Sequence, residues 1–90
     1  MAFYKLVWYK AALKDCRFIP KDHLNRILQK VTALENNPQP FQSQKLEGGT
    51  GKEYRLRIGD YRVVYEIEGP SKTITIFAVR HRREVYRNLG

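Results

Sequence analysis

Hydrophobic and polar side chains alternate at the start of the chain. Within residues 3–8 the two alternating sets are Phe3, Lys5 and Val7 on one side and Tyr4, Leu6 and Trp8 on the other. Aromatic and β-branched residues in such an alternation are typical of a half-buried strand. We therefore predict that the chain begins with a strand.

Two helices are predicted to follow this strand. Residues 9–18 are rich in helix formers, and Pro20 ends the first helix because it disfavours a helical conformation at Ile19. A second helix is predicted to begin at Asp22, whose carboxylate is placed to cap it. The apolar residues of this helix recur every three or four positions and are Leu24, Ile27, Leu28, Val31 and Leu34. Such a stripe predicts that the helix packs against a sheet.

Three more strands are predicted after a polar loop at residues 36–51, which is rich in proline and glycine. They cover residues 52–58, 61–68 and 73–79. Only Gly59 and Asp60 separate the first two strands, and a two-residue turn fixes the pairing of the residues beside it. The predicted cross-strand pairs are Ile58 with Tyr61, Arg57 with Arg62, and Leu56 with Val63.

The order strand, helix, helix, strand, strand, strand indicates an α+β fold. We predict an antiparallel sheet of about four strands packed by an N-terminal helical hairpin, and a short C-terminal helix within residues 80–87. A chain of 90 residues and 10.6 kDa has room for one small hydrophobic core. Residues 1–90 are therefore predicted to form a single domain, which excludes most multi-domain enzymes.

Charge narrows the choice of partner. Seventeen Lys and Arg against nine Asp and Glu give a formal charge of +8, and this favours a polyanion, with nucleic acid first and an anionic membrane second. Lysines interrupt the apolar N-terminus, and no apolar run reaches the roughly 20 residues of a membrane span, so we expect a cytoplasmic protein. The single Cys16 forms no internal disulfide, and metal-ligand spacings are absent, so no structural metal is expected.

The predicted hairpin separates apolar from basic side chains. One face carries Tyr54, Leu56, Ile58, Tyr61, Val63 and Tyr65, which we expect to be buried under the helices. The other face carries Arg55, Arg57 and Arg62. Like charges directly across a strand pair are destabilising, and arginine suits bidentate phosphate recognition, so this face predicts an anion site. A solvated outer face is the alternative reading.

The C-terminal segment adds groups that can move protons. Arg80 and His81 follow the last predicted strand, with Arg82 and Tyr86 close behind. Cleavage of RNA by its own 2′-hydroxyl needs a base, cations for the charged intermediate and an acid for the leaving oxygen, with no metal and no cofactor. A histidine titrates near neutrality, and nearby arginines lower the pKa of a phenol. A surface histidine and a packing tyrosine are the alternative readings.

Together, the segments KLEGG, YRLRIGDYRVVYEI and VRHRREVYR resemble the RelE/ParE superfamily of type II toxins, and its RelE branch in particular. The resemblance covers essentially the whole chain. It implies a microbial-RNase-like fold and a ribosome-dependent endoribonuclease that cuts mRNA in the ribosomal A site and inhibits translation. It also implies a cognate antitoxin, which we expect to be an acidic or amphipathic segment that covers the basic face.

The resemblance implies roles for the arginines of the sheet. Arg55 and Arg57 correspond to the basic pair that holds the substrate backbone, and Arg62 to the residue that contacts the scissile phosphate. Arg80 and Arg83 are expected to add to RNA binding.

Roles for the C-terminal segment follow from the same resemblance. Arg82 corresponds to the residue that stabilises the transition state, Tyr86 to the tyrosine that stacks on or activates the substrate, and His81 to a general acid or base. Arg57 stays protonated and cannot act as the base. The acidic base of some relatives has no clear counterpart in the loop, where Ser43 and Gln44 stand; Glu53 and Glu84 are weak substitutes.

Two other functions remain open at this point. The ParE branch shares the fold but poisons DNA gyrase, without the combination of arginines, histidine and tyrosine found in this chain. A non-catalytic module that binds RNA or the ribosome would need only the basic face. Because a fold does not determine a function, the ribonuclease is favoured by the candidate residues alone.

Overall fold

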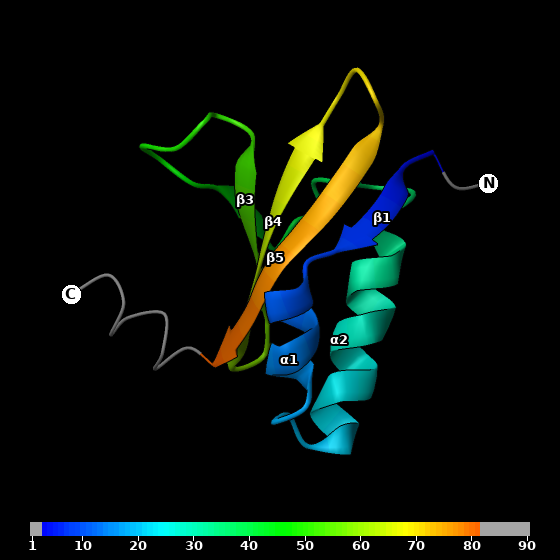
Figure 1. Cartoon of the computed structure of the whole chain (residues 1–90), viewed down its shortest axis with the longest axis vertical. Coiled ribbons are helices and arrows are strands. Elements are labelled where there is room, and N and C mark those ends of the chain that lie inside the picture. Colours follow the sequence, from blue (N-terminus) through cyan, green and yellow to red (C-terminus); the bar gives the residue numbers. More distant parts are fainter. Residues whose placement is uncertain (1–2, 82–90) are drawn as a thin grey trace.

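A computed structural model of the chain describes residues 3–81 and shows a sheet with two helices packed against it (Figure 1). The elements in chain order are β1 (Lys5–Trp8), α1 (Lys10–Cys16), α2 (Lys21–Ala33), β2 (Ser43–Lys45), β3 (Glu53–Ile58), β4 (Tyr61–Glu68) and β5 (Thr73–His81). The five strands lie in the order β1-β5-β4-β3-β2. The predicted α+β class and the two N-terminal helices are confirmed. The last strand continues to His81, two residues beyond its predicted end, and the rest of the segment predicted to contain a C-terminal helix, residues 82–87, lies outside the described residues.

The sheet differs from the prediction of about four antiparallel strands in two details. First, β1 pairs with β5 in parallel, from Lys5 beside Thr73 to Trp8 beside Ile76. The long connection that a parallel pair requires is present, because both helices and the strands β2 to β4 lie between β1 and β5 in the chain. An alternating pattern carries no information about strand direction. Second, β2 is an additional edge strand inside the predicted loop. Its three polar residues are too few to show a periodic pattern.

The hairpin between β3 and β4 has the predicted register. Ile58 pairs with Tyr61, Arg57 with Arg62, and Leu56 with Val63. Gly59 has a φ of +59°, a conformation that costs glycine little because it has no Cβ. The turn residues therefore determine which side chains of these two strands share a face.

The core lies between the sheet and the helices. The buried residues are Ala12, Ile27, Val31, Leu34, Leu56, Ile58, Val63, Tyr65, Ile74, Ile76 and Val79. The Tyr65 hydroxyl donates a 2.7 Å hydrogen bond to the carbonyl of Pro38. Burial of this phenol raises its pKa to about 12 because the charged form would lose its hydration.

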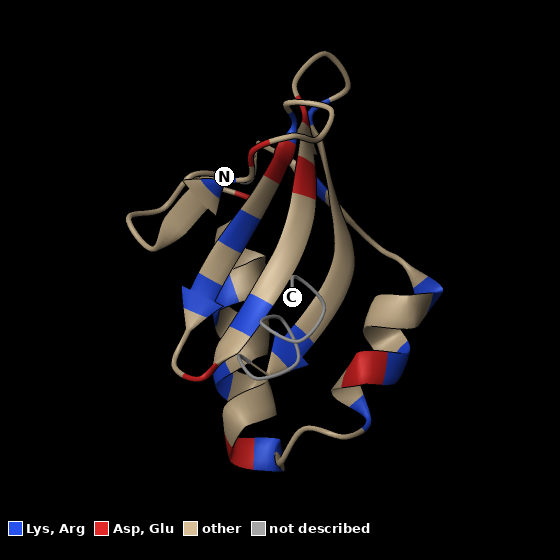
Figure 2. Ribbon diagram, turned by 90° about the vertical axis from the view of Figure 1, so that its left-hand side faces the viewer, with Lys and Arg blue, Asp and Glu red and all other residues tan. Residues whose placement is uncertain are grey.

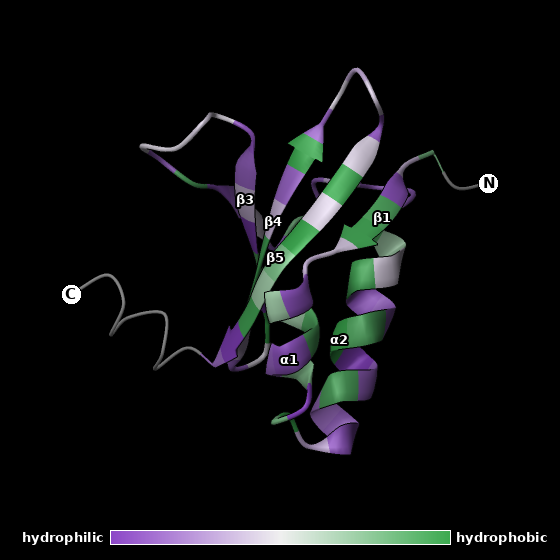
Figure 3. Cartoon of the chain, viewed as in Figure 1, coloured by the Kyte–Doolittle hydropathy of each residue, from purple (hydrophilic) through white to green (hydrophobic). Residues whose placement is uncertain are grey.

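Two expectations for α2 are corrected by the structure. Pro20, and not Asp22, occupies the N-cap position; Asp22 lies in the first turn, where its charge still favours the positive end of the helix dipole. Most of the apolar stripe faces the core, but Leu28 at its margin is 39% exposed. Figure 3 shows the hydrophobic residues recurring along the helix between hydrophilic ones. Neither helix of residues 3–81 is long and apolar enough to cross a bilayer.

Candidate phosphate-binding face

Four arginines project from the face of the sheet that the helices leave open. Arg57 of β3 pairs with Arg62 of β4, which in turn pairs with Arg80 of β5. These three residues form a row across adjacent strands, and Arg55 lies two residues before Arg57 on the same face. Strands are about 4.8 Å apart, so the row spans about 10 Å. Figure 2 shows the basic residues gathered at one end of the strands and acidic residues at the other.

A β-bulge brings Arg80 into this row. The register of β4 and β5 shifts by one residue between Val64, which pairs with Ala78, and Tyr65, which pairs with Ile76. Ile76 and Val79 are both buried, so the extra residue between them reverses the alternation along β5. Without the bulge Arg80 would point toward the helices. The sequence predicted a basic group near this position but gave no reason for it to face Arg62.

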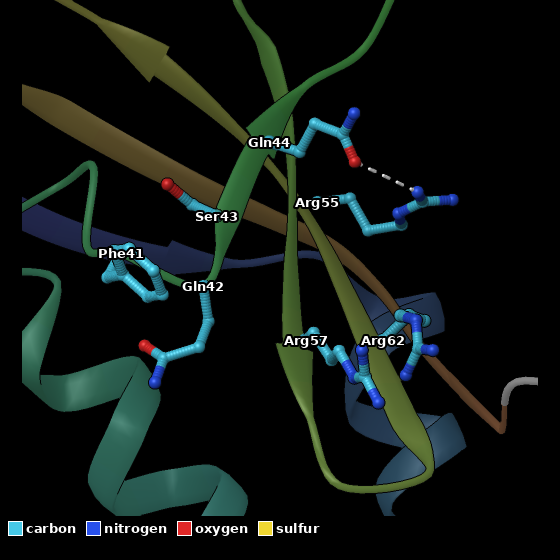
Figure 4. Close-up of a pocket in the computed structure, with 7 residues that line it drawn as sticks. All are labelled: Phe41, Gln42, Ser43, Gln44, Arg55, Arg57 and Arg62. Carbon is cyan, nitrogen blue, oxygen red and sulfur yellow. Dashed lines mark hydrogen bonds between the residues drawn. The ribbon is translucent and has the colours of Figure 1, made fainter.

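A cavity of about 450 Å³ opens beside the arginine row. Its lining residues are Phe41, Gln42, Ser43, Gln44, Arg55, Arg57 and Arg62. Figure 4 shows the side chains of Arg57 and Arg62 next to each other, and Arg55 reaching toward Gln44. Sequence reasoning gave no role to Phe41, Gln42 or Gln44, because β2 has no periodic signal that would place it at the sheet edge.

Neutral oxygen atoms orient the guanidinium groups of this cavity. Arg55 Nη2 donates a 3.4 Å hydrogen bond to Gln44 Oε1. Arg62 Nη1 donates to the carbonyls of Gly59 and Tyr61, at 3.1 and 3.0 Å. In the part of the chain that the structure describes, no carboxylate forms an ion pair with Arg55, Arg57 or Arg62. The positive charge of all three is therefore not neutralised by a carboxylate, which leaves it available to a phosphate, and the hydrogen bonds direct it at Arg55 and Arg62.

Arg80 is held from the side of the sheet by α1. One carboxylate oxygen of Asp15 lies 3.3 Å from Arg80 Nε and accepts a 3.0 Å hydrogen bond from the backbone N–H of Val79. Val79 lies beyond the last residue of β5 that pairs with β1, so Asp15 satisfies a backbone donor that the parallel ladder does not reach. The same carboxylate lies beside the guanidinium group of Arg80.

His81 lies on the other side of β5 from the arginine row. It pairs with Tyr61 across the ladder, and the two rings meet edge to face with centroids 5.3 Å apart. A second cavity, of about 320 Å³, is lined by Asp15, Phe18, Ile19, Tyr61, Val79 and His81. The structure therefore groups the sheet arginines in one place and puts His81 at the border of another. His23 is an exposed residue of α2, with its ring centroid 5.6 Å from that of Tyr61.

The remaining candidates lie outside the described residues. These are Arg82, Arg83 and Tyr86. Their roles, like those of the arginines and His81, stay predictions. Within residues 3–81 the structure shows no group of three or more His, Cys, Asp or Glu side chains that could hold a metal ion.

Comparison with known proteins identifies the family. Residues 6–86 match the sequence profile of the ParE toxin of type II toxin-antitoxin systems, parDE. The match covers most of the 90-residue chain, and the chain therefore belongs to this family of the RelE/ParE superfamily of toxins.

Individual relatives place the chain among RelE-like toxins. The protein designated RelE1 of Methanocaldococcus jannaschii is 31% identical over 83 residues, which are 89% of this chain and 91% of the relative. The crystal structure of the archaeal RelE–RelB complex from Pyrococcus horikoshii contains a chain that is 38% identical, with a TM-score of 0.79 over 89% of this chain and 96% of that one. The RelB–RelE complex from Methanococcus jannaschii gives 25% identity and a TM-score of 0.77, over 93% and 99% of the two chains.

Proposed function

We propose that this toxin is an endoribonuclease that cuts mRNA in the ribosomal A site and so inhibits translation. The observation that carries the proposal is the arginine row Arg57, Arg62 and Arg80, with Arg55 beside it, on an open sheet face. Guanidinium groups arranged side by side suit the bidentate binding of consecutive phosphates, and no carboxylate of the described residues pairs with Arg55, Arg57 or Arg62. The RelE names of the relatives support the same reading.

The proposed reaction uses the 2′-hydroxyl of the RNA as the nucleophile. A base takes the hydroxyl proton, the 2′ oxygen forms a bond to the adjacent phosphorus, and the bond from phosphorus to the 5′ oxygen breaks as that oxygen receives a proton. Arg57 and Arg62 stabilise the additional negative charge on the phosphorus centre without changing protonation state. Tyr86 is the candidate for base or acid, and Arg82 for stabilising the leaving group. His81 lies on the other side of β5 from the arginine row, so it is a candidate only for a substrate that passes around the end of this strand.

A protein antitoxin is the proposed inhibitor. Solved relatives include complexes of RelE with RelB, and an open face with this charge attracts an acidic segment. Such a partner would cover the arginines and exclude RNA. The ribosome, also a polyanion, is the proposed site of action.

The test is primer extension on mRNA incubated with the purified full chain, with and without translating ribosomes. We expect cuts at A-site codons that require ribosomes and disappear in Arg62→Ala. Arg26→Ala is the matched control, because Arg26 is an exposed arginine of α2 and its loss changes the net charge equally. Cuts in naked RNA would remove the ribosome from the proposal, and no cuts in either sample would overturn it.

A gyrase inhibitor is the second candidate function, because the family profile is described by the ParE toxin. Inhibition of gyrase-driven DNA supercoiling by the wild-type chain, in the absence of any RNA cleavage, would establish it. Binding of ribosomes or RNA without cleavage and without gyrase inhibition would instead indicate a non-catalytic binding module.

A further inference from the structure

Phe41 is an aromatic ring in water at the border of the arginine cavity. It is 98% exposed, the highest exposure among the large hydrophobic residues of the described chain, and it lines the same cavity as Arg55, Arg57 and Arg62. A single exposed apolar side chain needs no explanation by itself. A ring that shares a cavity with three guanidinium groups is a different case, since nucleotides present a flat apolar base beside an anionic phosphate.

The backbone holds this ring in a defined place. The carbonyl of Pro40 accepts hydrogen bonds from both the N–H and the hydroxyl of Ser43, at 2.9 and 2.7 Å, and this closes a tight turn that carries Phe41 and Gln42. The backbone N–H of Arg57 donates a 3.2 Å bond to the carbonyl of Gln42, which ties the turn to β3. Phe41 is thus attached to the strand that provides two of the arginines (Figure 4).

Charge on the open face determines how an RNA strand could reach the ring. At the end of the sheet away from the arginines, Glu53 pairs with Glu66 across β3 and β4. These carboxylates repel a phosphate backbone, so a strand of RNA is favoured along the arginine row, across the strands. In one direction that row leads past Arg57 to Gln42 and Phe41 at the β2 edge.

We propose that Phe41 is a stacking platform for one base of the single-stranded RNA whose phosphates lie on the arginine row. The Gln42 amide, in the same cavity, supplies a donor and an acceptor for the edge of that base. This inference rests on the proposed function, because it requires RNA on this face. Any base can stack on an aromatic side chain, so the contact increases the affinity for RNA and positions the strand on the face with little sequence preference.

Binding of short 2′-O-methyl RNA oligonucleotides, which lack the attacking hydroxyl, tests the proposal by fluorescence anisotropy. The variants are Phe41→Ala, Phe41→Leu and Phe41→Trp. Because the ring is exposed, we expect these variants to fold like the wild type, and circular dichroism checks that they do. Each variant is measured with the complete oligonucleotide and with versions that lack one base at a time but keep every phosphate.

We expect Phe41→Ala and Phe41→Leu to weaken binding of the complete oligonucleotide by about 5- to 100-fold, while Phe41→Trp retains it. Removing the stacked base should weaken the wild type by a similar factor and abolish the difference between it and Phe41→Ala. Equal binding by Phe41→Leu and the wild type would overturn stacking, and so would an effect of Phe41→Ala that persists with every abasic version.

The variant Arg62→Ala distinguishes failure of the stacking site at Phe41 from failure of the proposed RNA-binding face. If it weakens all the oligonucleotides while Phe41→Ala changes none, the stacking site is wrong and the RNA-binding face stands. If the wild type binds no oligonucleotide at any salt concentration, both the face and the stacking site are overturned.

Discussion

The two ends of the open sheet face carry opposite charges, and the charged side chains at each end have different partners. At one end Arg57 faces Arg62, and at the other Glu53 faces Glu66. The acidic end contains its own cation: Lys52 Nζ lies 2.7 Å from a carboxylate oxygen of Glu68, and this hydrogen bond and charge raise the pKa of Lys52. A backbone N–H from the adjacent loop also donates to Glu53.

The arginine end is arranged by neutral acceptors instead. Backbone carbonyls and a glutamine oxygen bind Arg62 and Arg55, and Asp15 reaches only Arg80. Like charges across a strand pair therefore do not identify a binding site, since they occur at both ends. What distinguishes the arginine end is that no carboxylate of the described residues pairs with Arg55, Arg57 or Arg62, so their charge remains available to an external anion.

Making the arginine end acidic should remove the difference in anion binding between the two ends of the sheet. In the double variant Arg57→Glu and Arg62→Glu, two charge-assisted contacts to phosphate are lost and two repulsive ones are added. We expect RNA affinity to fall by at least about 100-fold, from about 1.5–3 kcal/mol for each charged hydrogen bond. Equilibrium binding to single-stranded RNA measures this, with Arg17→Glu and Arg26→Glu as a control of equal charge change. An equal loss in the control would mean that net charge matters and position does not.

The core beneath both ends should respond to pH through Tyr65. The pKa of this buried phenol is about 12 in the folded chain, against 10.0 in a model peptide. Between these values the unfolded chain releases a proton that the folded chain keeps, so the free energy of unfolding is unaffected by this group below about pH 10 and falls as pH rises, by up to about 3 kcal/mol. Urea unfolding of the wild type and Tyr65→Phe should show this additional loss in the wild type alone. Parallel curves for the two proteins above pH 10 would contradict it.

Neutralising one charge at each end should affect RNA binding at only one of them. Arg57→Gln is expected to weaken RNA affinity by about tenfold and to reduce the dependence of log affinity on log salt by about 0.7, the slope of one phosphate contact to a single strand. Glu53→Gln keeps the acceptor for the loop N–H, and we expect unchanged or slightly tighter binding. Equal losses at the two positions would show that RNA crosses the acidic end as well.

The smallest expected effect is on stability. Glu66→Gln removes a repulsive cross-strand pair with Glu53 and should raise the free energy of unfolding by about 0.2–0.5 kcal/mol. Arg57→Gln should stabilise the hairpin by a similar amount while it weakens RNA binding. Urea unfolding at low and high salt measures both changes, which should shrink as salt screens the repulsion. A destabilised Arg57→Gln protein would indicate that this arginine contributes to the fold.

Much of the hairpin and of the helical layer could be predicted, because their determinants are local. The two-residue turn at Gly59 and Asp60 sets the register that brings Arg57 opposite Arg62. The spacing of Ile27, Val31 and Leu34 places α2 on the core. Each of these features depends on residues within a few positions of one another.

By itself, then, the sequence determined the apolar and basic faces of β3 and β4 and the presence of two helices. Only the tertiary structure decided that β1 joins β5 in parallel, that Asp15 holds Arg80, and that Phe41 borders the arginine cavity. The bulge in β5 shows the reason most clearly. Its sequence TITIFAVRH breaks alternation at Phe77 and Ala78, but which residue bulges depends on the strand packed beside it. Contacts between distant segments, which no local pattern encodes, thus turned Arg80 toward the open face.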